Sequence, residues 1–354
     1  MPKKINPELC YTGLANLGNT CFLNSCIQII RHTTELSELL DSAKTKKMKK
    51  EIVDRIILDE WNELRKLMST NHGVVSPNKF VHHIHEIART KDRDIFTGYA
   101  QNDMSEFLLF FVDCIHNSIS RPIQMRIRGN PENLVDKIAI KSYEMLQSVY
   151  QKEYSEIMGL MYGVYVTTIR SLPSPLANPD VLYSIHPEHF FILDLQLFNE
   201  QGVFTNIYQC FEHFIQPEVM QGENAWMNDT TSKKEDVMRA ISFWNMPDIL
   251  VVTFKRFLPD GIRKIENRID FPLEDLDLSK YVIGYNPSTY IYDLYGVCNH
   301  MGGTMGGHYT AYVKNSADIW VHYNDSNVEQ MKNLTHIVSP SAYCLFYRKK
   351  NKSV

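Results

Sequence analysis

The chain has 354 residues, 44% of them hydrophobic and 22% charged, which is the composition of a soluble globular protein with room for one large core or two ordinary ones. The net charge is only −4 at pH 7, so the sequence offers no basic surface that tracks nucleic acid, and we expect no nucleic-acid partner. No stretch approaches 18 apolar residues and no apolar run follows the N-terminal lysines, so we expect neither a membrane span nor a signal peptide.

Cysteine usage argues against a disulfide framework and against a metal held by cysteines. The chain holds seven cysteines, and no two of them stand at C-x-x-C spacing. We interpret His82, His83 and His85 as ordinary helix residues, because no carboxylate or cysteine at ligand spacing joins them. We therefore expect no metal, no cofactor and a reducing intracellular compartment, cytoplasmic or nuclear.

The stretch Gly13–Gln28 reads GLANLGNTCFLNSCIQ and places Cys21 where a turn becomes an amphipathic helix. Asn19 or Thr20 can cap the first helical turn with a side-chain oxygen. Unpaired backbone N–H groups and the helix dipole favour a thiolate there, so we expect a lowered pKa at Cys21. Asn16 can turn its amide toward an oxyanion on a carbonyl that Cys21 attacks. A buried structural cysteine is the alternative interpretation.

Three further helices are predicted between the helix that starts at Cys21 and residue 120, and in chain order they are the first, second and third of this group. The second helix begins at Ser76 and Pro77, an N-cap and first-turn pair, and the third opens at Asp103 and Glu106 in the manner of a capping box. The first helix covers Met48–Met68 with an apolar stripe made of Val53, Ile56, Ile57, Trp61, Leu64 and Leu67.

The middle of the chain gives weaker signals. Residues 121–133 are rich in turn formers and read as a loop, and Leu134–Leu160 reads as mostly helical. Ser171–Pro179 holds three prolines, and Phe190–Phe198 alternates only weakly as a strand. We therefore expect the least regular structure of the chain in Gly163–Lys234.

The last third of the chain is predicted to be rich in strands. Pro247–Phe257 alternates as a strand, and Tyr281–Tyr290 reads as a loop. Tyr292–Tyr312 (YDLYGVCNHMGGTMGGHYTAY) then forms two strands around a glycine-rich loop, and His308 opens the second strand. Trp320–Asp325 (WVHYND) follows it.

His308 and Asn324 supply what a thiol nucleophile needs. Such a nucleophile requires a histidine that takes its proton and an Asn or Asp that holds the imidazole tautomer. One hairpin's length separates His308 from Asn324. Asp325 either adds a negative charge near the imidazolium or is only a turn residue. A histidine without the glycine-rich loop that precedes His308 would more often be structural.

These stretches resemble the ubiquitin-specific proteases, deubiquitinating enzymes of the papain-like clan. Gly13–Gln28 is similar to the family's Cys box, and Tyr292–Tyr312 with the following WVHYND is similar to its His box. Tyr99–Leu108 (YAQNDMSEFL) resembles the family's Gln-Gln-Asp-x-x-Glu-Phe motif. Pro247–Phe257 (PDILVVTFKRF) resembles its Leu-Lys-Arg-Phe strand, and Ala342–Tyr347 (AYCLFY) resembles its last strand.

The resemblance implies an α+β fold of the ubiquitin-specific protease type, with a helical thumb, a β-rich palm and degenerate β fingers. It spans about residues 11 to 349 in the family's order and implies one catalytic domain there. The implied divisions are an extension at 1–10, a thumb at about 11–140, a fingers insertion at about 160–245, a palm at about 246–349 and a tail at 350–354.

The fingers of this family usually carry two C-x-x-C pairs that bind zinc, and this chain departs from that pattern. The first pair falls on Ser171 and Ser174, and the second on Met227 and Thr230. Without four thiolates there is no tetrahedral site, so we predict no structural zinc. We expect apolar packing to replace it, by Tyr165, Phe190, Phe191, Phe204, Phe211 and Trp226.

The resemblance also implies roles in acyl transfer to a thiol. His308 takes the proton of Cys21, and the thiolate attacks the carbonyl of ubiquitin's last glycine. Asn16 and the backbone N–H of Cys21 stabilise the oxyanion. Asn324 orients His308, and water finally hydrolyses the thioester.

Substrate-binding roles are implied for residues around the groove that takes ubiquitin's C-terminal tail. Asp103 and Glu106 would pair with the arginines of that tail, although a plain helix start explains both residues equally well. The loop glycines would wall a channel too narrow for a side chain, or would only form a hairpin loop. The full expected set is Gln101, Asp103, Glu106, His300 (also a candidate loop anchor), Gly303, Gly306, Gly307 and Tyr309.

The implied function is hydrolysis of the peptide or isopeptide bond after the last glycine of ubiquitin by a monomeric chain. Two alternatives stay open. One is a protease for another modifier that ends in Gly-Gly, and the other is a catalytically silent scaffold that binds ubiquitin. The complete set of Cys21, His308, Asn324 and Asn16 argues against the silent scaffold.

Overall fold

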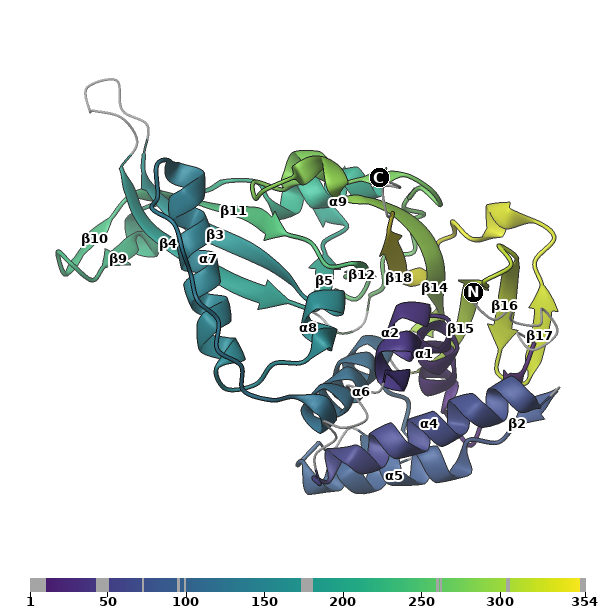
Figure 1. Ribbon diagram of the computed structural model, residues 1–354. Helices are drawn as coiled ribbons and strands as arrows, with labels where there is room; N and C mark the ends of the chain where they lie inside the picture. Colours follow the sequence, from purple (N-terminus) through teal and green to yellow (C-terminus); the bar gives the residue numbers. More distant parts are fainter. Residues whose placement is uncertain are drawn as a thin grey trace.

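Helix α1 (Cys21–Arg31) lies between a group of helices and a large sheet in the computed structural model (Figure 1). The helix is amphipathic, as predicted, and every residue from Cys21 to Ile30 is nevertheless buried, so its polar residues Asn24 and Gln28 are covered as well. Helix α6 covers one side and strands β14, β15 and β16 cover another. The structure describes residues 11–42, 51–71, 73–93, 96–98, 100–172, 181–258, 261, 263–303 and 306–350.

Helices α4, α5 and α6 lie below α1 in Figure 1, and their buried faces follow the sequence pattern in part. The apolar stripe predicted for Met48–Met68, which contains helix α4, is wrong in part. Val53, Ile56 and Leu67 are exposed, while Leu58 and Met68 are buried. The face that meets α5 and α6 is therefore rotated from the predicted stripe. Residues 43–50, with the predicted start at Met48, lie outside the described residues. The thumb helices are α1, α2 (Thr34–Asp41), α4 (Asp54–Thr70), α5 (Asn78–Thr90) and α6 (Met104–Ile119).

The palm sheet carries the C-terminal motifs. Its strands lie in the order β17-β16-β15-β14-β18-β12-β5, with β13 paired to β14. Strand β12 is buried along its whole length, which corrects the predicted alternation, because β12 lies between β18 and β5 with a hydrophobic core on each face. The strands are β5 (Ile192–Leu195), β12 (Ile249–Phe254), β13 (Leu276–Asp277), β14 (Ile291–Gly303), β15 (Gly306–Lys314), β16 (Trp320–Asn324), β17 (Asn327–Gln330) and β18 (Ala342–Lys349).

The fingers sheet projects from the palm at the left of Figure 1 in the strand order β4-β3-β11-β8. The prediction that Gly163–Lys234 is the least regular region is therefore wrong, because this region holds the long strands β3 and β4 of the sheet. The local sequence gives no sign of this, since β3 pairs with β11 about 70 residues further along the chain. Helix α7 packs against β3, β4 and β11. The elements are α7 (Leu134–Tyr150), α8 (Glu156–Met161), β3 (Gly163–Ser171), β4 (Leu182–Phe190), β8 (Glu218–Met220), β9 (Trp226–Asn228), β10 (Lys233–Glu235) and β11 (Val237–Asn245).

The tip of the fingers is held by an aromatic stack and a small polar network. Tyr183 of β4 and Trp226 of β9 stack with ring centroids 5.8 Å apart. Asn228 Nδ2 donates to Glu235 Oε1 at 2.9 Å across the β9–β10 hairpin. Among the predicted aromatic residues only Trp226 is at this tip stack, whereas Phe190 and Phe211 pack in the core behind the palm sheet. Ser174 lies outside the described residues.

The remaining elements are short. Helix α9 (Ile207–Phe214) packs beside β5, and the region predicted as a loop at 281–290 contains a 3₁₀ turn at Pro287–Thr289. No described helix is both long and apolar enough to cross a membrane. The domain boundaries expected from the sequence stay a prediction. The other strands are β1 (Gly13–Leu14), parallel to β2 (Val74–Val75), and β6 (Phe198–Asn199), paired with β7 (Gly202–Val203).

Candidate active site

Cys21 is the first residue of α1, as predicted, and it is 3% exposed. The turn before it uses left-handed backbone angles at Gly18 (φ 99°) and Asn19 (φ 57°). Asn16 Oδ1 closes the turn by accepting from the N–H groups of Gly18 at 3.0 Å and Thr20 at 3.2 Å. The predicted helix cap is wrong, because Thr20 stands at the N-cap and its hydroxyl accepts from Leu17 N–H at 2.9 Å instead.

The prediction of a lowered pKa at Cys21 is also wrong for the free chain. Burial is the largest effect and raises the pKa of the Cys21 thiol, and the nearby carboxylate of Asp325 raises it further. Hydrogen bonds from the backbone N–H groups of Tyr309, Phe22 and Cys21 lower this pKa without cancelling the burial effect. The thiol therefore needs a proton acceptor close by before it becomes a nucleophile.

His308 and Asn324 come together as the sequence predicts. His308 is in β15 and Asn324 ends the neighbouring strand β16, and His308 Nε2 lies 2.7 Å from Asn324 Oδ1. Because the amide oxygen can only accept, this contact places the ring proton on Nε2 and leaves a lone pair on Nδ1. Strand β15 packs on α1, and the backbone N–H of Tyr309, the residue after His308, is bonded to the Cys21 thiol.

Asp325 is tied to the turn before Cys21. It accepts from Asn16 Nδ2 at 2.9 Å and from Asn24 Nδ2 at 2.8 Å, and its backbone oxygen accepts from Leu14 N–H at 2.9 Å. Asp325 thus orients the amide of Asn16. Asn24 was not predicted as a site residue, although an asparagine three positions after Cys21 in the predicted helix is a signal that could have found it.

Gln101 and Asp103 join the N-terminal end of α6 to the palm sheet. Gln101 makes two hydrogen bonds with the backbone of Gly307. Its Nε2 donates to Gly307 O at 2.8 Å, and its Oε1 accepts from the N–H of Gly307 at 2.6 Å. Asp103 Oδ1 caps α6, as predicted, by accepting from the N–H groups of Ser105 and Glu106. The side chain of Glu106 is exposed.

Asp103 Oδ2 accepts from the hydroxyls of Tyr309 and Tyr343 at 3.4 Å and 2.5 Å. The side chain of Tyr309 is 5% exposed, so it supports Asp103 from beneath the surface. Direct contact of the Tyr309 ring with a substrate, as expected from the sequence, does not fit this burial.

His300 is buried beneath the β14–β15 hairpin and is 4% exposed. Its ring lies 4.6 Å from the ring of Tyr309, and Lys264 Nζ lies 3.0 Å from its Nδ1. Burial and the Lys264 ammonium lower the pKa of His300 to about 4. Lys264 also donates to the backbone oxygens of His300 at 2.8 Å and Gly302 at 3.0 Å. The loop-anchor interpretation of His300 fits this burial, and direct substrate contact does not.

The hairpin glycines have different surroundings. A Cβ atom on Gly307 would lie 2.6 Å from Met301 O and closer still to His300 Nε2, so the fold itself requires glycine there. A Cβ atom on Gly303 would meet nothing within 4 Å, and one on Gly306 would lie 4.0 Å from Gln101 Oε1. Only Gly303 and Gly306 therefore leave space that a substrate backbone can use.

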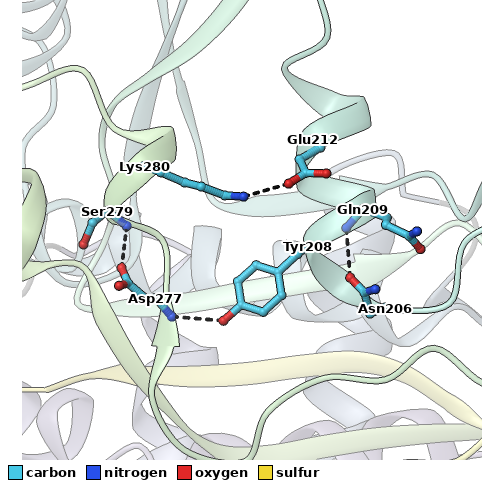
Figure 2. A pocket seen from close by; sticks show the side chains of 7 residues that line it. All are labelled: Asn206, Tyr208, Gln209, Glu212, Asp277, Ser279 and Lys280. Atoms are coloured by element: carbon cyan, nitrogen blue, oxygen red, sulfur yellow. Dashed lines mark hydrogen bonds and ion pairs between the residues drawn. The ribbon is translucent and has the colours of Figure 1, made fainter.

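A separate hollow of about 620 Å³ lies beside α9, and none of the predicted site residues lines it. Figure 2 shows Lys280 and Glu212 paired across it at 2.7 Å, with Tyr208 beneath them. The described residues contain no group of three or more His, Cys, Asp or Glu side chains that could hold a metal ion. The chemistry-bearing residues thus gather at the α1–β15 contact and not at this hollow.

Cys21 at a helix start, with His308 oriented by Asn324 on the strands that pack against that helix, is the kind of arrangement that cysteine hydrolases use. A family model described as "Ubiquitin carboxyl-terminal hydrolase" matches residues 12–347. The chain therefore belongs to the ubiquitin carboxyl-terminal hydrolase family.

Similar proteins are found among both sequences and structures. Human ubiquitin carboxyl-terminal hydrolase 2 is 32% identical over 348 residues, which cover 95% of this chain and 54% of that protein. Usp2 of Drosophila melanogaster is 30% identical, and the match covers 95% of this chain and 34% of that protein. The chain spans about half the length of the first of these relatives. The SAGA DUB module of Ubp8, Sgf11, Sus1 and Sgf73 bound to ubiquitin aldehyde matches with a TM-score of 0.71 and 21% identity, covering 99% of this chain and 72% of that one.

Proposed function

We propose that the chain is a cysteine-type deubiquitinase, which hydrolyses the peptide or isopeptide bond after the last glycine of ubiquitin. One observation carries the proposal. Cys21 at the start of α1 lies against the backbone N–H of Tyr309, while His308, one residue earlier in β15, is oriented by Asn324 at 2.7 Å. Membership of the ubiquitin carboxyl-terminal hydrolase family supports ubiquitin as the substrate. The proposal includes a monomeric chain that acts inside the cell.

The first half of the reaction acylates the thiol. His308 Nδ1 accepts the proton of Cys21, so that a thiolate and an imidazolium form together and the raised pKa of the isolated thiol is overcome. The thiolate attacks the carbonyl carbon of ubiquitin's last glycine, and the carbonyl oxygen becomes an oxyanion. When the C–N bond breaks, the leaving amine takes the proton from His308 and a thioester remains on Cys21.

The second half of the reaction releases ubiquitin. His308, neutral again, accepts a proton from water as the water oxygen attacks the thioester carbonyl, and the thiol leaves with that proton. Asn324 keeps the Nε2 proton in place through both halves, so Nδ1 faces the reaction each time.

Asn16 stabilises the oxyanion in this proposal, together with the backbone N–H of Cys21. Asn16 Nδ2 carries two protons and donates one of them to Asp325 Oδ2, so the second proton is free for the substrate oxygen. The carboxylate of Asp325, fixed in turn by Asn24, holds the donor in its orientation before substrate arrives.

The test is mass spectrometry of the purified protein after incubation with ubiquitin that carries a thiol-reactive warhead at its C-terminus. We expect a single ubiquitin adduct on Cys21, none on Cys21→Ala and a much slower adduct on His308→Ala. An adduct at another cysteine would refute the assignment of Cys21.

Two other results decide between the remaining functions. An adduct with a different modifier that ends in Gly-Gly, and none with ubiquitin, would mean that the mechanism is correct and that this other modifier is the substrate. Binding of ubiquitin by the wild-type chain, with no adduct from any modifier, would make the chain a silent scaffold.

A further inference from the structure

Residues 122–128, between α6 and α7, lie extended along α7 without belonging to a sheet (Figure 1). Their side chains alternate in exposure with the period of two that a β-strand has. The half-buried side chains are Ile123, Met125 and Ile127, and the exposed ones are Gln124, Arg126 and Arg128.

One edge of this segment is already held. Arg121 and Tyr154 exchange two backbone hydrogen bonds of 2.8 Å, and Ile123 N–H donates to Tyr150 O at 2.9 Å. The guanidinium of Arg121 is bound by both carboxylate oxygens of Glu156, at 3.0 Å and 2.6 Å. The segment is therefore ordered in its extended form before any ligand arrives, which lowers the entropy cost of binding.

The other edge is open. In an extended segment the N–H and C=O groups of alternate residues point to opposite edges, so those of Gln124, Arg126 and Arg128 point away from the edge that Ile123 uses. Within the part of the chain that the structure describes, the N–H groups of these three residues have no hydrogen-bond partner. Such an edge is a template for one more strand.

The open edge carries positive charge. Arg126 and Arg128 are both exposed, lie on the same face and, among the described residues, make no ion pair. The carboxylate of Asp136, at the start of α7, is occupied by Glu132 N–H at 3.0 Å and by the Tyr285 hydroxyl at 2.7 Å. Pairing with the same edge of a second copy would set arginine against arginine, which is unfavourable.

We propose that residues 122–128 form a docking edge for an extended acidic segment of a partner protein. The segment adds as a strand, and two of its carboxylates, two residues apart, pair with Arg126 and Arg128. Backbone hydrogen bonds supply affinity, and the two arginines select acidic sequences. The docking edge contains none of the residues assigned to catalysis, so its test is independent of the proposed deubiquitinase activity.

The probe is a fluorescent, terminally blocked octapeptide of alternating Glu and Val, measured by anisotropy against the full chain. We expect it to bind at least about tenfold more tightly than the same peptide with Lys in place of Glu. Arg126→Glu/Arg128→Glu should weaken binding by about tenfold or more, and so should raising the salt from about 0.05 to 0.3 M. Lys66→Glu/Lys79→Glu, which changes the net charge equally on exposed thumb residues, should leave the affinity within about twofold.

A second readout separates strand addition from simple charge attraction. The bound peptide should slow amide hydrogen exchange in residues 122–128, and a peptide N-methylated along its hydrogen-bonding edge should bind at least about tenfold more weakly. Melting temperature and ubiquitin cleavage should be unchanged in Arg126→Glu/Arg128→Glu, which checks the fold. Equal binding of Glu and Lys peptides, no exchange protection, or tighter binding of a dT12 oligonucleotide would each overturn the proposal.

Discussion

Replacing Gly307 by alanine tests whether this glycine is required by the fold or by the substrate. The new Cβ atom would lie 2.6 Å from the backbone oxygen of Met301 and would overlap the ring of His300. Neither neighbour can yield easily, because one is backbone and the other is a buried ring held by Lys264. Overpacking of this kind costs about 1–3 kcal/mol, and weakening the Lys264–His300 hydrogen bond adds about 1 kcal/mol.

We therefore expect Gly307→Ala to lose about 2–4 kcal/mol of unfolding free energy, which corresponds to a fall of about 3–5 °C in melting temperature for a chain of 354 residues. His308 is the next residue, so a shift of the hairpin displaces the proposed catalytic base. A displacement near 1 Å costs about 100-fold in rate, so kcat/KM should fall by about that factor. Melting is followed by calorimetry and cleavage with a fluorogenic ubiquitin substrate.

Gly303→Ala and Gly306→Ala are the matched controls. Neither glycine has a left-handed backbone angle, and their Cβ atoms would make no close contact. Both variants should melt within about 1 °C of the wild type. If these two glycines border the path of the substrate tail, cleavage of ubiquitin should nevertheless fall in both. A Gly307→Ala chain that melts and cleaves like the wild type would refute the packing argument.

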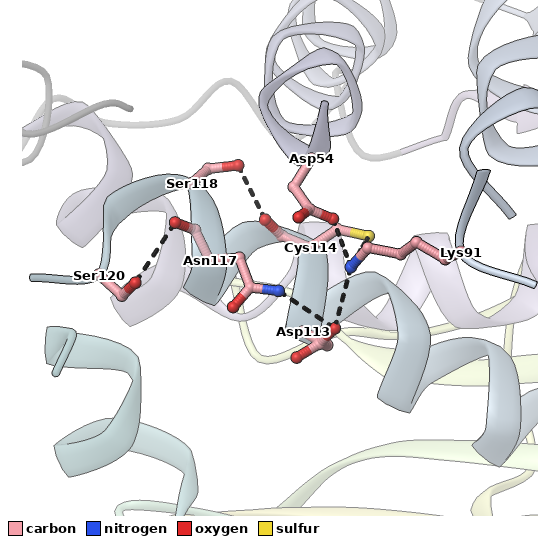
Figure 3. Close-up of polar contacts among 7 residues, drawn as sticks. All are labelled: Asp54, Lys91, Asp113, Cys114, Asn117, Ser118 and Ser120. Atoms are coloured by element: carbon pink, nitrogen blue, oxygen red, sulfur yellow. Dashed lines mark hydrogen bonds and ion pairs between the residues drawn. The ribbon is translucent and has the colours of Figure 1, made fainter. Parts of the chain in front are cut away.

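Three further predictions follow from the structure. Asn324→Ala removes the acceptor that orients His308, so kcat should fall by about 10- to 100-fold with KM little changed. Asn324→Asp keeps an acceptor and should retain most of the activity. An unchanged kcat in Asn324→Ala would contradict this role. Burial, followed by the charge of Arg31, lowers the pKa of His32 to about 4, below its unfolded value of about 6.5, so stability is complete above pH 6.5 and is lost as the pH falls toward 4. Urea unfolding should show about 2 kcal/mol of this loss at pH 5, and His32→Asn should remove that part of the pH dependence. Figure 3 shows Asp54 paired with Lys91 between α4 and the end of α5, and the two charged atoms lie 2.5 Å apart. Because Asp54 is buried, Asp54→Ala should cost about 2–4 kcal/mol of unfolding free energy in urea. The same change at the half-exposed Asp113, 3.2 Å from Lys91, should cost under about 1 kcal/mol.

The local motifs could be predicted from the sequence because their signals are short-range. Cys21 at a helix start and Asp103 as an N-cap follow from residue types within a few positions. The contact of His308 with Asn324 follows from hairpin length, because β15 and β16 are adjacent antiparallel strands and Asn324 ends β16 near the start of β15.

The sequence could not reveal features that depend on distant parts of the chain. The pairing of β3 with β11 joins segments about 70 residues apart, so weak local alternation gave no sign of it. The direction of the Cys21 pKa shift depends on burial by the palm sheet, which outweighs the helix terminus that is visible in the sequence. Lys264 was missed because it meets His300 only in the folded chain.

The position of His308 depends on contacts that three separate segments make with its neighbours. Gln101, from the segment before α6, holds the backbone of Gly307 on one side, and the ring of His300 in β14 fills the space on the other. Lys264, from the segment between β12 and β13, fixes His300 in turn. Because these supports come from the thumb and from two parts of the palm, His308, the proposed catalytic base, reaches its place only when both have assembled. The site is thereby coupled to the whole fold, and a packing change at Gly307 should therefore reach the chemistry without touching a catalytic side chain.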